Sequence, residues 1–236
     1  MRSSIVCAVV FASAAANTAM GGVVADYQSD FTTSGAAAPG WSYLWNKNGP
    51  IGTAANYVPL VRDANPLGSY ETEANGTYPD PVPGVLLSAT PISLIPGQAS
   101  AENSVQRFAI AAYTVSAADI AANGNQGILD NYTFGVAGAS LDGITAAIYV
   151  NDTPIVPSLQ LPPGIVYDRS FPDAYPVPLG DLSAGDTIYV ALGGGATSTG
   201  DILVIDYSIV LVPEPAAFSM LAVGAAALLA RRRRQS

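Results

Sequence analysis

Three aromatic side chains of this chain are spaced as a ligand-binding row would be. Trp41, Tyr43 and Trp45 stand at positions i, i+2 and i+4, so in a β-strand their rings would share one face. A flat row of rings can stack on pyranose sugars, because the ring faces meet the axial C–H groups of the sugar. We therefore take these three as candidate ligand-binding residues. The alternative, which the size of the side chains favours, is that they form the core side of one strand.

A second group of side chains could be imagined as the carboxylate pair of a glycosidase. Glu71 and Glu73 lie near Asp80 in an irregular region, but spacing along the chain does not fix the separation of two carboxyl groups. Acidic loops could also hold Ca²⁺ through oxygen atoms. The run that begins at Asp119, however, has Ala121 where an oxygen ligand is needed. We assign no catalytic residue, no metal ligand and no cofactor, and we leave Ca²⁺ binding open.

The residue types that most hydrolases use are missing from the chain. It has no histidine, and its single cysteine, Cys7, falls in a segment that we expect to be removed. Without histidine there is no Ser-His or Cys-His dyad, and the commonest general base and metal ligand are absent. Without other cysteines the body has no disulfide, so its stability must come from burial. These observations predict a protein that is not an enzyme.

The charge of the central part of the chain argues against a nucleic-acid partner. Between residues 26 and 213 the sequence has four basic residues (Lys47, Arg62, Arg107 and Arg169) and seventeen acidic ones, which gives a formal charge of -13. A surface this negative repels phosphate backbones. Divalent cations and neutral sugars remain compatible with it.

The first 25 residues have the composition of a secretory signal peptide. Arg2 is followed by an apolar run from Ile5 to Ala16 and then by small residues. The run is too short to span a bilayer stably. Cleavage after Ala25 or after Gly21 fits the small-residue pattern, and we place the end of the leader at residue 25.

The last 25 residues, 212–236, form a separate unit. Pro213 and Pro215 cannot donate to a ladder, so they stop the preceding strand. Fifteen uncharged, mostly apolar residues follow from Ala216 to Ala230, a length that is marginal for crossing the hydrocarbon core and fits a transient anchor. Four arginines beyond it would be held on the cytoplasmic side. The pattern predicts a short transmembrane helix that leaves the body outside.

This order of Pro213-Glu214-Pro215, short apolar segment and terminal arginine cluster resembles the PEP-CTERM sorting signal. The resemblance implies recognition by an exosortase, a membrane-embedded cysteine protease that cuts near the motif and releases or transfers the protein to the cell surface. Pro213, Glu214 and Pro215 would be the recognised residues, and membrane insertion would be transient. The membrane stop would consist of Arg231, Arg232, Arg233 and Arg234. Proteins with this signal often occur in bacteria that make extracellular polysaccharide, which makes such a polymer a candidate partner.

The central part, residues 26–211, has the pattern of one all-β domain. Short runs of β-branched, aromatic and alanine residues alternate with Gly, Pro, Asn and Asp, as in an antiparallel β-sandwich or jelly roll. The clearest strands are predicted at residues 106–115, 131–137, 144–150, 187–192 and 202–212, and weaker ones at 40–45, 57–61, 85–88 and 155–161. Residues 117–122, with Ser116 as N-cap, predict a single helical turn. The Pro-rich stretches 78–84 and 161–178 are predicted as ordered loops.

Period-two alternation predicts which strand faces are buried. One face of each of three strands is expected to be apolar: Tyr132, Phe134 and Val136; Ile144, Ala146, Ile148 and Val150; and Leu203, Ile205, Tyr207, Ile209 and Leu211. In the last strand Asp206 and Ser208 point the other way, so we expect one buried and one wet face.

The stretches 30–34, 41–43 and 182–188 loosely resemble β-sandwich domains of other PEP-CTERM proteins, which supports the fold more than it supports sugar binding. We expect an exported protein, carried through the inner membrane and sorted by exosortase to the cell surface or the extracellular matrix. Its β-sandwich would have a structural or adhesive role without catalysis. The alternative is a carbohydrate-binding module that uses the aromatic row.

Overall fold

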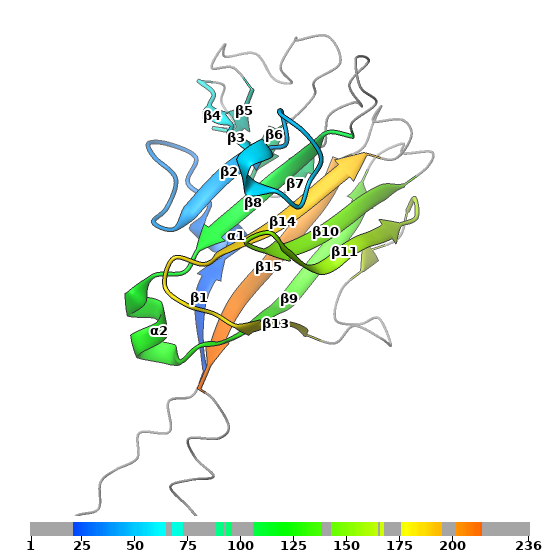
Figure 1. Cartoon of the computed structure of the whole chain (residues 1–236). Coiled ribbons are helices and arrows are strands. Elements are labelled where there is room, and N and C mark those ends of the chain that lie inside the picture. Colours follow the sequence, from blue (N-terminus) through cyan, green and yellow to red (C-terminus); the bar gives the residue numbers. More distant parts are fainter. Residues whose placement is uncertain are drawn as a thin grey trace, which may run out of the picture.

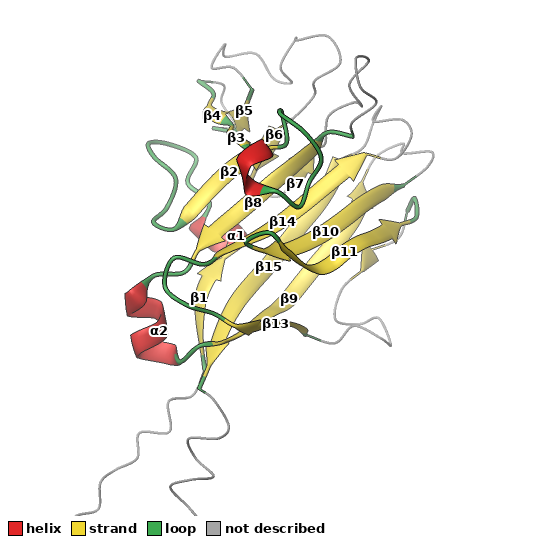
Figure 2. Cartoon of the chain, viewed as in Figure 1, coloured by secondary structure: helices red, strands yellow, loops and turns green. Residues whose placement is uncertain are grey.

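The computed structural model describes residues 21–64, 68–72, 88–91, 93–95, 106–137, 143–164, 166–167, 176–194 and 202–213. In this part of the chain the strands form two antiparallel sheets, and helix is confined to short segments (Figure 2). The expected all-β class and the antiparallel two-sheet architecture are confirmed.

The larger sheet has nine strands among the described residues. Its order is β12-β9-β15-β7-β6-β5-β4, with β1 beside β15 and β13 beside β9. β15 is central, because β9 pairs along one of its edges while β1 and β7 share the other. The strands are β1 (Gly22–Asp26), β4 (Val61–Arg62), β5 (Tyr70–Glu71), β6 (Ser88–Thr90), β7 (Ser93–Ile95), β9 (Gln126–Ala137), β12 (Val166–Tyr167), β13 (Val177–Asp181) and β15 (Ile202–Val212).

The smaller sheet has six strands in the order β11-β10-β14-β8-β2-β3. They are β2 (Trp41–Trp45), β3 (Val58–Pro59), β8 (Phe108–Thr114), β10 (Ile144–Val150), β11 (Thr153–Leu161) and β14 (Thr187–Gly194). Two α-helices, α1 (Tyr27–Asp30) and α2 (Ala117–Asn123), and a 3-10 turn, η1 (Ala54–Asn56), complete the described elements (Figure 1).

Most of the strongly patterned strands lie where they were predicted. β10 and β15 have the predicted bounds, but β9 begins at Gln126 rather than at Asn131. Asn131 has a positive φ of 48°, and the pairing of β9 with β15 shifts between Asp206 and Ser208. Asn131 therefore lies in a β-bulge inside the strand. The pair Asp130-Asn131 has the composition of a turn, because Asp and Asn tolerate the positive φ that is commonest in turns. This is why the strand was predicted to begin only at Asn131.

The strand predicted at residues 57–61 consists of two strands in different sheets. β3 belongs to the smaller sheet and β4 to the larger one. Leu60 lies between them, buried, and its N–H donates to the Tyr43 carbonyl oxygen at 2.8 Å. The chain crosses from one sheet to the other at this residue.

Two further predictions fall partly or wholly outside the described residues. Of the strand predicted at 85–88, residues 85–87 lie outside them, and β6 begins at Ser88. The loop predicted at 78–84 lies outside them as well. The stretch 161–178 contains the end of β11, the short strand β12 and the start of β13, so it is less irregular than expected.

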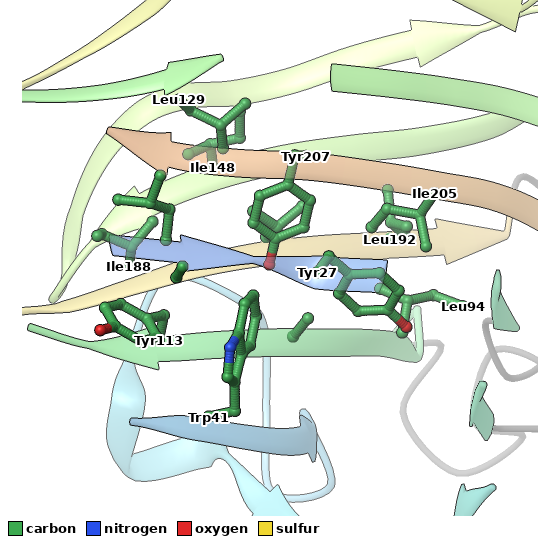
Figure 3. Close-up of a cluster of buried hydrophobic side chains, with 14 of the residues drawn as sticks. Tyr27, Trp41, Leu94, Tyr113, Leu129, Ile148, Ile188, Leu192, Ile205 and Tyr207 are labelled. Atoms are coloured by element: carbon green, nitrogen blue, oxygen red, sulfur yellow. The ribbon is translucent and has the colours of Figure 1, made fainter. Parts of the chain in front are cut away.

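The inward faces of the two sheets form one core. The predicted alternation of β15 is confirmed for Ile205, Tyr207, Ile209 and Leu211, which are all buried. Figure 3 shows Trp41 from β2 reaching toward Tyr207 from β15 across this core, with ring centroids 5.9 Å apart. The opposite face of β15 is drier than predicted. Ser208 is buried there, because β1 packs alongside and Asp26 accepts a hydrogen bond from its hydroxyl at 2.9 Å.

The outer face of the smaller sheet is also apolar. Side chains of β8, β10 and β14, including Ile110, Tyr149 and Tyr189, are buried there under the segment that carries η1. Tyr57 from this segment meets Tyr189 edge to face at 5.1 Å. Burial raises the pKa of the Tyr57 hydroxyl to about 12. The middle of this sheet is thus covered on both sides.

The ends of the body are only partly as predicted. The helical turn at 117–122 is confirmed as α2, with Ser116 as its N-cap. Residues 22–25, which the predicted leader includes, belong to β1 in the larger sheet, and Ala25 is buried there. Among the described residues no helix is long and apolar enough to cross a membrane. The apolar runs of the predicted leader and tail lie outside the described residues.

Candidate functional site

The predicted recognition motif begins where the central strand of the larger sheet ends. β15 stays paired to its last residues, with Val212 opposite Gln126 of β9 and Leu211 opposite Gly22 of β1. Pro213 follows directly and ends the ladder, because it has no N–H to donate. The start of β1 and the end of β15 meet at the lower end of the body in Figure 1. The motif therefore joins the body without a linker.

The backbone of Gly124 lies against the first proline of the motif. A β-carbon on Gly124 would come 2.6 Å from the Cα of Pro213 and 2.7 Å from the carbonyl oxygen of Val212. A β-carbon on Gly21 would overlap Val212 from the side of β1. Gly124 also has a φ of 93°, which other residues rarely adopt. Only glycine allows the chain to approach Pro213 so closely.

Helix α2 holds Gly124 at this place. At its start Ser116 and Asp119 form a capping box: the Asp119 carboxylate accepts from the Ser116 N–H at 2.8 Å, and the Ser116 hydroxyl accepts from the Asp119 N–H at 3.1 Å. At its end the Gly124 N–H donates to the Ile120 carbonyl oxygen at 2.9 Å and closes the last turn. The Asn123 side chain fills the space beside Gly22. The acidic residue that was considered for Ca²⁺ thus serves as a helix cap.

β1 carries one irregularity, at Val24. Its register with β15 shifts between Val23 and Ala25, and the carbonyl oxygen of Val24 accepts from the Tyr113 hydroxyl of β8 at 3.1 Å. The same hydroxyl lies 3.0 Å from Asp119 Oδ2. Burial, together with the hydrogen bond and charge of Asp119, raises the pKa of Tyr113. Tyr113 therefore ties both β1 and the cap of α2 to the smaller sheet.

The aromatic row is not an exposed surface, which corrects the sugar-stacking hypothesis for two of its three rings. Trp41 is 5 % and Tyr43 is 3 % exposed, because the face of β2 that they share is the one that packs on the larger sheet. The Trp41 ring lies 5.9 Å from the rings of both Tyr27 and Tyr207. Its Nε1 donates to Asp30 Oδ2 at 3.0 Å. The core interpretation of these two residues is confirmed.

Trp45 is the member of the row that stays partly exposed. Two cations flank its ring: Lys47 Nζ lies 5.8 Å and the Arg107 guanidinium carbon 5.7 Å from the centroid, within cation–π range. Arg107 Nη1 also donates to the carbonyl oxygens of Asn46 and Lys47 at 2.8 Å each. Neither cation pairs with a carboxylate among the residues that the structure describes. Trp45 thus marks a local positive spot on an acidic body.

The carboxylates considered for a glycosidase pair are not brought together in the described part of the chain. Glu71 lies in β5 and is fully buried, and its Oε1 accepts from the Ser69 hydroxyl at 2.6 Å. Glu73 and Asp80 lie outside the described residues. Within those residues no group of three or more Cys, Asp or Glu is close enough to hold a metal ion. Glu71 has the surroundings of a structural residue.

Two residues that the sequence pattern did not mark organise the end of the core. Tyr27 is fully buried, stacks on Tyr207 at 5.6 Å and donates to the Thr90 carbonyl oxygen at 2.7 Å. Burial raises its pKa well above the ordinary value. Arg62 lies over the Tyr70 ring at 4.0 Å and donates to its hydroxyl at 2.6 Å. The only sequence feature that could have drawn attention to Arg62 is the small number of cations in the body. Tyr27 could not have been predicted as a core residue, because it stands in a short polar stretch without periodicity.

Comparison with known proteins finds a match at the end of the chain. The family model described as the PEP-CTERM protein-sorting motif matches residues 211–234. The match begins inside β15 and includes Pro213, which the structure describes. It also includes residues that lie outside the description: Glu214, Pro215, Arg231, Arg232, Arg233 and Arg234. No curated protein and no solved structure matches the chain.

Proposed function

We propose that this exosortase substrate, which its sorting motif directs out of the cell, uses its body as a non-catalytic β-sandwich with a structural or adhesive role at the cell surface or in the extracellular matrix. The observation that carries the proposal is the continuity of β15 with the motif. Leu211 is fully buried in the core, and Pro213 follows two residues later. The body is therefore the cargo that the tail sorts.

The position of the two ends of the body supports a route through the inner membrane. β1 begins next to the last residues of β15, so a leader and a tail that extend from these strands start at the same end of the sandwich. The apolar run 216–230 would hold this end at the membrane for a time, and Arg231 to Arg234 would stay on the cytoplasmic side. The rest of the body would then stand outside.

The composition of the chain supports a role without catalysis. The chain has no histidine, and its single cysteine is Cys7. Two of the three side chains of the candidate row, Trp41 and Tyr43, are used for the core. These features fit a stable non-catalytic domain better than an enzyme.

Localisation in a producing bacterium tests the sorting step. In cells with exosortase, the protein should be found at the surface or in the medium with the mass of a chain that lacks its arginine cluster. In an exosortase deletion, it should remain in the membrane fraction with the cluster intact. Recovery of the full chain from the cytosol of normal cells would refute the proposal.

The structural or adhesive role needs a separate test. A strain that lacks the protein should show weaker cohesion of its matrix under shear than its parent, and complementation with the full chain should restore it. A chain in which the four terminal arginines are replaced by glutamine provides the control, because its body is unchanged while its sorting should fail. Equal cohesion in all strains would refute the role.

A second candidate function is weak binding of an acidic polysaccharide at Trp45. Lys47 and Arg107 occupy positions over the ring, so a neutral sugar cannot stack there without displacing them. The same two cations are available to carboxylate groups of a polymer, since neither pairs with a described carboxylate. The formal charge of -13 on the body opposes such binding at long range. Because salt screens this repulsion, we expect a low salt concentration to strengthen the binding. We expect the binding to be specific to this spot.

Retention on immobilised alginate, compared with neutral dextran, tests this candidate. The double variant Lys47→Gln and Arg107→Gln should lose retention on alginate, whereas Trp45→Phe, which keeps a ring under the cations, should lose less. Thermal unfolding of each variant controls for folding. Equal retention of the wild type on both matrices would eliminate the candidate.

A further inference from the structure

We propose that the folded body fixes where the tail is cut, so that the cut falls on the carboxyl side of Pro213. The close packing of Pro213 on Gly124 restricts the access of the protease to the motif. The inference rests on the proposed removal of the tail. It goes further, because it assigns Pro213 to the product and gives a role to Gly124, which caps the end of α2 and lies outside the motif.

The pairing of β15 excludes a cut further toward the N-terminus. Residues 208–211 of this strand pair with β1 on one side and with β9 on the other, and Val212 remains paired with β9. Ile209 and Leu211 are fully buried. Proteases cleave folded chains at exposed segments or after local opening. A cut before Val212 would require the central strand of the larger sheet to leave its core.

The protection extends to Pro213 itself. The missing side chain of Gly124 leaves room for the Pro213 nitrogen and Cα and for the Val212 carbonyl oxygen, which lie 2.6 to 2.7 Å from the place of a β-carbon. The peptide bond between Val212 and Pro213 therefore lies against the backbone at the end of α2. We therefore expect the cut beyond this bond, on the carboxyl side of Pro213.

The cut itself needs no redox partner. One peptide bond on the carboxyl side of Pro213 breaks, its carbonyl carbon passes to water or to an acceptor amine, and its nitrogen leaves with the tail as an amine. Because Glu214 is only one residue beyond the packed proline, the enzyme must bind the motif directly beside the body. Opening this contact should therefore speed the cut.

The intact mass of the mature protein, isolated from a bacterium that carries its exosortase, tests the position of the cut. We expect a last residue at 213 or later, and a last residue at 212 or earlier would overturn the inference. If residues 214–236 are retained in full, the proposed removal of the tail has failed instead. The two failures are thus distinguished by mass.

Two full-length variants test the restriction, with the half-life of the precursor as the readout. Gly124→Ala should displace Pro213 and shorten the half-life by roughly threefold or more. Gly185→Ala is the matched control, because Gly185 has a φ of 95°, close to the 93° of Gly124, but nothing lies within 4 Å of its β-carbon position. Equal half-lives of these two variants would overturn the restriction.

A spacer provides a test that leaves the packing of the body intact. Insertion of Gly-Gly-Ser between Val212 and Pro213 moves the motif away from Gly124 without changing any residue of the sheets. The precursor should then be cut faster than the wild type, by a factor similar to that of Gly124→Ala. An unchanged half-life would contradict the proposal even if Gly124→Ala failed to fold.

Discussion

The Tyr113 hydroxyl donates to the carbonyl oxygen of Val24 at 3.1 Å and thereby joins the bulge of β1 to the smaller sheet. This contact lies between the first strand of the larger sheet and a strand on the other side of the core. The hydroxyl has one proton and two acceptors within reach, because Asp119 Oδ2 lies 3.0 Å away. Tyr113 therefore couples the two sheets and α2 near the end that carries the sorting motif.

Removal of this hydroxyl should loosen β1. We expect Tyr113→Phe to lower the free energy of unfolding by about 1 kcal/mol, the usual size of one hydrogen-bond contribution, and to speed amide exchange in β1. Urea unfolding and hydrogen exchange measure the two effects. Tyr149→Phe is the control, because no hydrogen bond of its hydroxyl is present among the described residues. A loss of stability in the control that equals that of Tyr113→Phe would argue against the tie.

The leader should be removed after Gly21 and not after Ala25. A cut after Ala25 would remove three of the four register pairs between β1 and β15, and with them the carbonyl oxygen that Tyr113 binds. We expect Gly22 as the first residue of the mature protein, read by N-terminal sequencing. A mature chain that starts at Asp26 would contradict this, and Ala19→Leu, which spoils the small-residue pattern before Gly21, should make the precursor accumulate.

The two strands that were predicted with the right bounds, β10 and β15, each carry an apolar side chain at every second residue. β15 alternates in this way and has the predicted bounds, whereas β9 was predicted short because Asn131 interrupts it with a positive φ. The change of sheet at Leu60 could not be predicted, since a run of apolar residues does not record which sheet each one enters.

The candidate site was predictable only in its linear part. Pro213 and the arginine cluster form a local pattern that can be read without a fold. The contact of Pro213 with Gly124 joins residues far apart in the sequence, and it follows from the pairing of β9 with β15. For Trp41, alternation predicted a shared face with Tyr43 but could not say which face is buried, because both faces of the smaller sheet are apolar.

The two tryptophans of the row should differ in their contribution to stability. Trp41→Ala should lower the free energy of unfolding by about 3–5 kcal/mol, as expected for loss of a large core aromatic, whereas Trp45→Ala should have a smaller effect because its side chain is partly exposed. Chemical unfolding of both variants provides the measurement. Trp41→Phe, which keeps a ring but loses the hydrogen bond to Asp30, should fall between wild type and Trp41→Ala. A Trp41→Ala protein as stable as the wild type would mean that the ring is not part of the core.

Two aspartates, Asp206 in β15 and Asp26 in the neighbouring β1, should affect stability in opposite directions as pH changes. Burial, and then the nearby charge of Asp26, raise the pKa of Asp206 above 3.8. Burial would also raise the pKa of Asp26, but hydrogen bonds from Ser29 and Ser208 outweigh it and lower that pKa below 3.8. The folded state therefore disfavours the charge of Asp206 and favours that of Asp26.

The sign of each effect follows from the unfolded value of 3.8. Charged Asp206 lowers stability at pH values above its folded pKa, and this loss disappears as pH falls below 3.8. Charged Asp26 adds stability above 3.8, and this gain is lost as pH falls through its lower folded pKa. Asp206→Asn should thus be more stable than wild type at pH 7, by no more than about 1 kcal/mol because solvent screens a partly exposed carboxyl, and equal to it in acid. Asp26→Asn should be less stable than wild type at pH 7, because it loses the favoured charge. Unfolding curves of both variants from neutral to acid pH measure the two differences, which should have opposite signs.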